Sequence, residues 1–483
     1  MVEKTQAGQV LSVASECVPL IKTGGLADVA GALPGALGAL GWDVRTILPA
    51  YPGLLARLGK AREIWSDPDL FGGPGRVLLG RVGAVRIALL DAPHLYARDG
   101  GPYSVAGKDY PDNPERFAAL CWAAAALARG AGADGWRADV LHAHDWQAGL
   151  APAYLRYADG PRVATVQTIH NIAFQGLAPA TRLAALRLPA GAYQTNGVEF
   201  WGSISALKAG LVTADALTTV SQTYANELMR PEFGMGLQGV IAERASALHG
   251  ILNGIDTDVW NPETDPEGPA FNAARMTGKT AARAVLAAEF GLEQVPGPLA
   301  IVVSRLTGQK GIDLLPGVLP DFIASGGGLA VLGTGDPLLE AAMTEAATSF
   351  PGRVSARIGY DEGLSHRMFK GADAVLVPSR FEPCGLTQMY GLRYGAVPVV
   401  AATGGLADTV IGAGPASLAA KAATGITFHP VDGLALAQAL RQLVTLHADK
   451  PAWRALQRRG MQAELGWGRA AESYGALYRS LIG

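Results

Sequence analysis

The chain has few cysteines and few charged residues. Cys17, Cys121 and Cys384 lie far apart and form neither a CxxC pair nor a zinc-like spacing, which predicts free thiols in a reducing compartment, the cytoplasm. Charged residues make up 17% of the chain and the formal net charge is −2, so no overall field attracts nucleic acid or an anionic membrane. Recognition of an anion must therefore depend on a few local cations.

Long apolar segments are also missing. The longest apolar run, 117–128, is well short of the roughly 20 residues of a membrane span and predicts a buried helix. The run 10–14 is too brief for the apolar core of a secretory signal. We therefore expect no membrane partner.

The length and the hydrophobic content favour an α/β protein with two large domains. A chain of 483 residues exceeds the usual size of one domain, about 100 to 200 residues. Hydrophobic residues make up 49% of it, as expected when sheets are buried on both faces. Short aliphatic runs alternate with helical patterns, which predicts parallel strands joined by right-handed crossovers. Predicted strands occupy 9–15, 43–50, 85–92, 138–144, 162–170 and 216–221, then 299–306, 328–335, 353–360, 373–379 and 397–403.

A passage rich in Pro, Gly and Asp, 253–269, separates the two sets of strands. It predicts a boundary between two Rossmann-like, doubly wound domains, 1–252 and 253–466. The remaining segment, 467–483, has the pattern of an amphipathic helix. Because ligand-facing loops follow the carboxyl ends of parallel strands, we expect a deep cleft lined by loops of both domains.

A glycine-rich turn occurs twice, as "KTGGLAD" at 22–28 and "TGGLAD" at 403–408. Each copy is predicted to follow a strand and to open a helix, where the Gly pair permits close approach and N–H groups favour an anion or a hydroxyl. Only the first copy carries a cation, Lys22, which predicts phosphate binding there. A tight connection without a ligand is the alternative for a single copy.

The second half contributes two further groups of polar residues at strand ends. "SRLTGQKG" places Arg305 and Lys310 after a strand, where two cations suit a diphosphate. "SRFEPCGLTQ" places Glu382 before the start of a helix, where it could accept hydrogen bonds from sugar hydroxyls. A helix-capping carboxylate is the alternative for Glu382.

The first half places His144, Asp145 and His170 at strand ends. The spacing of His142 and His144 puts both rings on one side of a strand, but no further metal ligands follow, so we expect no metal site and interpret His142 as a core residue. "GTGDPLLE" has Leu338 where a dinucleotide fingerprint needs its third glycine, which argues against a nicotinamide-dependent dehydrogenase or epimerase.

Taken in order, these motifs resemble those of the glycogen and starch synthase family. The resemblance is carried by "KTGGLADVAGALP", "HAHDWQAGLAP", "HNIAFQG", "LNGID", "SRLTGQKG", "IGYDE", "SRFEPCGLTQMYGLRYG" and "TGGLADTV". It implies a GT-B fold and the transfer of glucose from ADP-glucose to the non-reducing end of an α-1,4-glucan such as glycogen, with retention of configuration. It implies no metal and no cofactor, and it implies that 467–483 packs back on the first domain.

The resemblance also implies the roles of single residues. It implies donor phosphate and glucose contacts for Lys22, Gly24, Gly25 and Asp28, donor or acceptor contacts for Asp145, His170 and Asn253, diphosphate neutralisation by Arg305 and Lys310, adenine stacking by Tyr360, glucose hydroxyl binding by Glu382, and a phosphate site lined by Cys384, Gly385, Leu386 and Thr387.

The sequence leaves the chemical route of the transfer open. A retaining transfer proceeds through a covalent intermediate, with Glu382 as nucleophile, or through attack on the face that the diphosphate leaves. The many cations favour the second route.

Ala402 stands where bacterial relatives often have Arg, so an anion contact there is not expected. A non-catalytic glucan-binding scaffold is the remaining alternative, and it would not need Lys22, Arg305 and Glu382 at strand ends.

Overall fold

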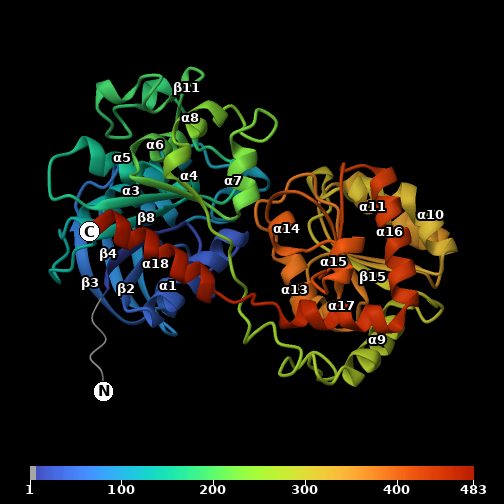
Figure 1. Cartoon of the computed structure of the whole chain (residues 1–483). Helices are drawn as coiled ribbons and strands as arrows, with labels where there is room; N and C mark the ends of the chain where they lie inside the picture. The colour runs from blue at the N-terminus through green and yellow to red at the C-terminus, as the bar shows by residue number, and fades with distance from the viewer. Residues whose placement is uncertain (1–6) are drawn as a thin grey trace. The chain divides into compact units, whose positions relative to one another are not determined.

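The computed structural model describes residues 7–483 and divides into two compact units (Figure 1). The first unit extends to Asn253 and also contains Trp467–Gly483. The second unit is Gly254–Gly466. The end of the chain therefore returns to the first unit, and Asn253 is the last residue before the chain enters the second.

A nine-stranded sheet forms the centre of the first unit. All six strands predicted for this half are present, and they run parallel to one another. The expectation of a wholly parallel sheet is wrong at one edge, because β4 pairs antiparallel with both β5 and β3. In order across the sheet the strands are β14 (Leu248–Gly250), β13 (Ala216–Thr219), β9 (Ala164–Ile169), β8 (Val140–His144), β1 (Gly8–Val13), β2 (Trp42–Pro49), β5 (Val85–Asp91), β4 (Gly75–Val82) and β3 (Gly59–Asp67).

A six-stranded sheet forms the centre of the second unit, and all of its strands are parallel. The five predicted strands are confirmed, and the short β20 extends the sheet at one edge. In order they are β17 (Val354–Ile358), β16 (Gly328–Gly333), β15 (Leu299–Val303), β18 (Ala374–Val377), β19 (Val397–Ala401) and β20 (Ile426–Phe428).

The central parallel strands of each sheet are buried on both faces. Successive residues of one strand point to opposite sides, and accordingly Val10 and Leu11 belong to different hydrophobic clusters, as do Ile301 and Val302. The covering helices of the first unit include α1 (Gly25–Ala39), α3 (Asn113–Ala128), α5 (Leu150–Tyr157), α6 (Ala206–Thr213) and α18 (Gly468–Ile482); those of the second include α9 (Thr277–Phe290), α10 (Leu315–Ala324), α11 (Pro337–Ser349), α12 (Glu362–Gly371), α13 (Thr387–Arg393), α16 (Gly433–Ala448) and α17 (Lys450–Gln462).

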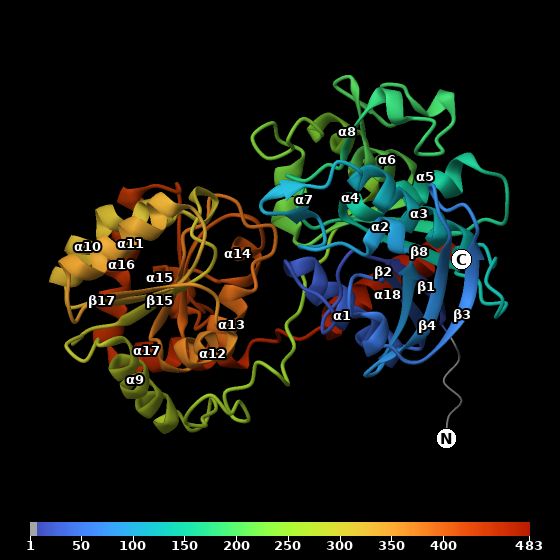
Figure 2. The ribbon, with the colours of Figure 1, turned by 180° about the vertical axis from the view of Figure 1, so that it is seen from behind.

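The terminal helix α18 packs beside α1 in the first unit (Figure 2). Tyr474 and Tyr478 are its largest buried side chains, and the Tyr478 ring meets Trp42 of β2 edge-on at 5.3 Å. The predicted buried helix over 117–128 is confirmed as part of α3. Within residues 7–483, no helix combines the length and the apolar character that crossing a bilayer requires.

Candidate functional site

The first glycine-rich turn ends a long loop instead of following its strand directly. Strand β1 ends at Val13, and α1 begins at Gly25 with Gly24 as its N-cap. The Lys22 Nζ donates to the Asp28 Oδ1 over 2.8 Å, and the Lys22 side chain is nearly half exposed. The lysine is therefore held at the start of α1 with its amine accessible.

A buried carboxylate that the sequence reasoning missed holds this loop in place. Glu16 accepts hydrogen bonds from the backbone N–H of Thr23, from the Thr23 hydroxyl at 2.5 Å, from the Gly24 N–H at 3.3 Å and from the Tyr103 hydroxyl. Glu16 is only 3% exposed, and a buried carboxylate persists only when such donors satisfy it. An acidic residue within an otherwise apolar segment was the available signal.

The two copies of the glycine-rich turn serve different purposes, contrary to the expectation that both offer their N–H groups to a ligand. A Cβ on Gly404 would lie 2.0 Å from the Glu382 carbonyl oxygen, and one on Gly405 would lie 2.1 Å from that of Cys384. The Gly405 N–H donates to the Glu382 carbonyl oxygen over 3.1 Å. The second copy therefore needs glycine for backbone packing.

The first copy has no such packing reason for its glycines. Apart from its neighbours along the chain, a Cβ on Gly24 or on Gly25 would meet no atom of residues 7–483 within 4 Å. Open space beside two consecutive glycines leaves room for a ligand to approach the backbone closely. This contrast distinguishes the candidate ligand turn from its structural duplicate.

Asp145 occupies a strained position directly after β8. Its φ is 55°, in the left-handed region that costs a non-glycine residue free energy. Its buried Oδ1 accepts hydrogen bonds from the backbone N–H of His170 at 2.7 Å and of Asn171 at 3.2 Å. Burial raises the pKa of the Asp145 carboxyl to about 7, and the charge of Glu16 contributes in the same direction. The structure thus brings Asp145 and His170 together. Glu16, which holds the Lys22 loop, lies close enough for its charge to raise the pKa of Asp145.

Three buried histidines, His142, His144 and His170, lie close to one another here. The His144 Nδ1 and the His170 Nε2 are 3.0 Å apart, and the His144 Nε2 lies 3.1 Å from the Ser12 hydroxyl. Burial lowers the pKa of His142 and of His170 to about 3 and that of His144 well below its usual value, so all three are neutral at pH 7.

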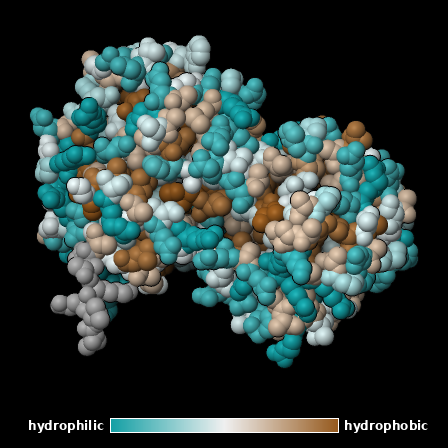
Figure 3. Space-filling view, in the orientation of Figure 1, coloured by the Kyte–Doolittle hydropathy of each residue, from teal (hydrophilic) through white to brown (hydrophobic). Residues whose placement is uncertain are grey.

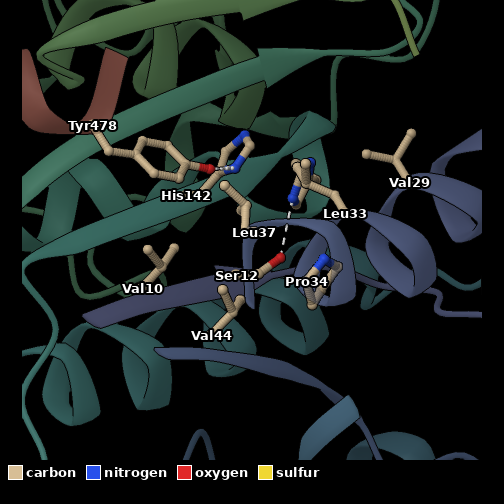
Figure 4. A pocket seen from close by; sticks show the side chains of 10 residues that line it. Val10, Ser12, Val29, Leu33, Pro34, Leu37, Val44, His142 and Tyr478 are labelled. Atoms are coloured by element: carbon tan, nitrogen blue, oxygen red, sulfur yellow. Dashed lines mark hydrogen bonds between the residues drawn. The ribbon is translucent and has the colours of Figure 1, made fainter. Parts of the chain in front are cut away.

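His142 has the environment of a core residue, in agreement with its interpretation. Its Nδ1 accepts or donates a hydrogen bond with the Tyr478 hydroxyl at 2.7 Å, and its Nε2 is paired with the Thr168 hydroxyl at 2.5 Å. His142 and Tyr478 line a small cavity together with apolar side chains of β1, β2 and α1 (Figure 4). Among residues 7–483, no group of three or more His, Cys, Asp or Glu side chains is arranged to hold a metal ion.

Asn253 is a further buried polar group of the first unit. It is 8% exposed, and its Oδ1 has no hydrogen-bond partner among the described residues. An unsatisfied buried acceptor in a native structure calls for a partner such as water or a ligand donor.

In the second unit, Lys310 and Glu382 form a partly buried ion pair. The Lys310 Nζ donates to the Glu382 Oε2 over 2.5 Å, and the Ser379 hydroxyl donates to the same oxygen over 2.9 Å. The loops that carry them follow β15 and β18, which are adjacent in the sheet. The alternative interpretation of Glu382 as a helix cap is wrong, because α13 has no side-chain cap.

The remaining predicted residues of the second unit lie in loops after strands of its sheet. Arg305 is exposed after β15, and Tyr360 after β17 is 80% exposed with its hydroxyl 3.3 Å from the Glu362 carboxylate. Cys384 is buried, and Gly385, two residues before α13, has a φ of 68°. This turn exposes parts of Leu386 and Thr387 at the start of the helix.

Comparison with known proteins identifies the class of enzyme to which the chain belongs. The family model described as the starch synthase catalytic domain matches residues 9–243, and the model described as glycosyl transferases group 1 matches 297–445. Sucrose-phosphate synthase from Thermosynechococcus elongatus superposes with a TM-score of 0.60 at 20% identity, over 98% of this chain and 99% of that one, and supports the fold alone. Two Rossmann-like units with these matches define a GT-B glycosyltransferase.

The relatives then define the family. A glycogen synthase of Cereibacter sphaeroides is 62% identical over 99% of this chain and 100% of its own length, and one of Paracoccus denitrificans is 56% identical over 98% and 99%. The catalytic domain of starch synthase IV from Arabidopsis thaliana, solved bound to ADP and acarbose, superposes with a TM-score of 0.88 at 30% identity, over 98% of this chain and 99% of that one. The chain belongs to the glycogen and starch synthase family and is a glucosyltransferase of glycogen synthesis.

Proposed function

We propose that this enzyme transfers glucose from ADP-glucose to the non-reducing end of an α-1,4-glucan in the cytoplasm, with retention of configuration and release of ADP. The observation that carries the proposal is the ion pair of Lys310 and Glu382 at the ends of two adjacent strands. A cation and a carboxylate fixed in this way suit a ligand that combines a diphosphate with a sugar.

The second unit supplies the groups for the nucleotide. Lys310 and the exposed Arg305 neutralise the diphosphate, and an opposite charge at about 4 Å contributes roughly 4 kcal/mol at an effective dielectric of 20. The exposed ring of Tyr360 stacks on adenine. Glu382 accepts hydrogen bonds from glucose hydroxyls, and the backbone of Cys384, Gly385, Leu386 and Thr387 lines the phosphate site.

The first unit supplies the remaining contacts. The accessible amine of Lys22 binds a donor phosphate, and the open backbone at Gly24 and Gly25 allows close approach of the donor. Asp28 fixes the position of the lysine. Asp145 and His170 lie near the reacting carbon, where the His170 carbonyl oxygen stabilises developing positive charge, and Asn253 offers its unpaired amide oxygen.

The contacts of Glu382 favour the route without a covalent intermediate. Its Oε2 is already engaged by Lys310 and by Ser379, and neutralisation of a carboxylate by a cation reduces its strength as a nucleophile. In the favoured route a leaving phosphate oxygen takes the proton of the acceptor hydroxyl. The protein then contributes positioning and electrostatic stabilisation of the leaving group.

The test measures ADP release from ADP-glucose and, in competition, from UDP-glucose, with glycogen as primer. We expect release to depend on glycogen, and Lys22→Ala and Arg305→Ala each to lower turnover by about 10²-fold, the scale for a preorganised charge partner. Arg458→Ala removes an exposed cation from α17 and serves as the control. Glycogen-independent release, or near-normal turnover in both folded variants, contradicts the proposal.

A further inference from the structure

Three loops of the first unit are connected near β11 (Glu199–Phe200; Figure 1), and Trp201 directly follows this strand. The Gln175 side-chain amide donates to the Met235 carbonyl oxygen over 2.8 Å. A Cβ on Gly236 would lie 3.0 Å from the Phe200 ring and 3.3 Å from the Trp201 ring. We refer to Phe174, Phe200, Trp201 and Met235 as the aromatic platform.

The aromatic platform leaves large apolar side chains in solvent. Trp201 is 84% exposed, Phe174 is 60% exposed and Met235 is 48% exposed. On the face that Figure 3 shows, hydrophobic residues are interspersed among hydrophilic ones, and single exposed ones need no explanation. Several large ones on loops joined by specific contacts point to a binding surface instead.

The backbone at the aromatic platform is unfavourable for the residues that occupy it. Phe200 pairs with Ser203, so Trp201 and Gly202 form the two-residue turn between β11 and β12 (Ser203–Ser205). The φ values are 49° at Trp201 and 79° at Gly202; a hairpin turn with two positive φ values favours Asn followed by Gly. Met235 has a φ of 47° as well. Two exposed apolar residues are thus kept where the backbone prefers small or polar ones, and such outliers accumulate at functional positions.

We propose that the aromatic platform binds a glucan chain at a point distinct from the reacting end. None of its four side chains carries a charge, which suits a neutral polysaccharide, and the C–H faces of glucose rings pack against aromatic rings. It is linked to the candidate site through the chain, because Phe174 lies in the loop that begins at His170 and Asn171, whose N–H groups donate to the Asp145 carboxylate. The inference rests on the proposed function only in its choice of glucan as the ligand.

The test compares binding and transfer in variants of Trp201. Trp201→Asn places the favoured residue in the turn, so we expect a melting temperature equal to or above that of the parent. The same variant is expected to weaken retardation in glycogen-containing native gels and to raise the KM for glycogen about tenfold. With maltotriose as acceptor, which is too short to extend far, kcat is expected to stay unchanged. Trp201→Tyr keeps a ring and is expected to retain most of the binding.

Leu434→Ala is the matched control, because Leu434 is 69% exposed at the start of α16 in the second unit. Unchanged gel retardation and unchanged KM for glycogen in Trp201→Asn would overturn the proposal. So would a parent protein that self-associates through this surface in sedimentation experiments, with Trp201→Asn abolishing association and leaving glycogen binding intact. Failure of the proposed function gives a separate result, since the parent would then release no ADP with maltotriose while glycogen retardation remained measurable.

Discussion

Replacing Asp145 by Asn should stabilise the first unit at alkaline pH. The carboxyl is buried and its pKa is raised from 3.8 to about 7, so between these two values the folded protein holds a proton that the unfolded chain has released. Stability therefore falls as pH rises through this range. Asn tolerates the left-handed backbone at this position, and its side-chain oxygen can accept the same two backbone hydrogen bonds. The substitution thus removes the ionisation with little other change.

The shift gives the magnitude of the effect. At about 1.4 kcal/mol per pKa unit, the complete penalty of ionising Asp145 in the folded state is about 4 kcal/mol. Part of it is already present at pH 5, because the unfolded carboxyl is mostly ionised there. We therefore expect the free energy of unfolding of Asp145→Asn, relative to the parent, to increase by about 2 to 3 kcal/mol between pH 5 and pH 8.

Urea denaturation at several pH values measures this difference. Asp109→Asn, on the exposed strand β7 (Lys108–Asp109), controls for loss of a charge as such. Turnover of Asp145→Asn is expected to fall by about 10²-fold at the same time if, as proposed, this carboxylate acts electrostatically on the reacting carbon. A relative stability that does not change with pH, or that decreases from pH 5 to pH 8, would refute the reasoning.

Two further predictions concern the glycines and the histidines. Gly404→Ala forces a Cβ onto a carbonyl oxygen at 2.0 Å and should destabilise the second unit by about 1 to 3 kcal/mol. Gly24→Ala should instead keep the parental melting temperature and lower the affinity for the donor. Equal losses of stability in the two variants would contradict the different roles assigned to these glycines. Because the pKa values of His142 and His170 fall to about 3 and that of His144 falls well below its usual value, the unfolded chain binds more protons than the folded one below about pH 6.5. The free energy of unfolding should then decrease as pH falls from 6.5 towards 3. Circular dichroism in an acid titration measures this loss of stability. If the rings were charged in the folded state, the titration would show no loss of stability from these histidines.

The amino-acid sequence determined most of the framework. Buried parallel strands are nearly continuous aliphatic runs, so the eleven predicted strands of the two sheets were visible as local patterns. The edge hairpin of β3 and β4 was missed. Most residues of β3 are exposed and carry little apolar periodicity, whereas β4 alternates buried and less buried residues, a local pattern that was available in the sequence. The family was also visible, since its motifs are short contiguous segments.

Only the tertiary structure decided what the individual groups do. The two glycine-rich turns are almost identical in sequence, and the space around each backbone, which distant residues create, separates a packing role for Gly404 from an open one for Gly24. The hydrogen bond from the Tyr103 hydroxyl to Glu16 and the ion pair of Lys310 with Glu382 likewise join residues from different loops. Local patterns specify strands and helices because these depend on near neighbours, whereas burial, pKa shifts and hydrogen-bond partners depend on segments that meet only in the folded chain.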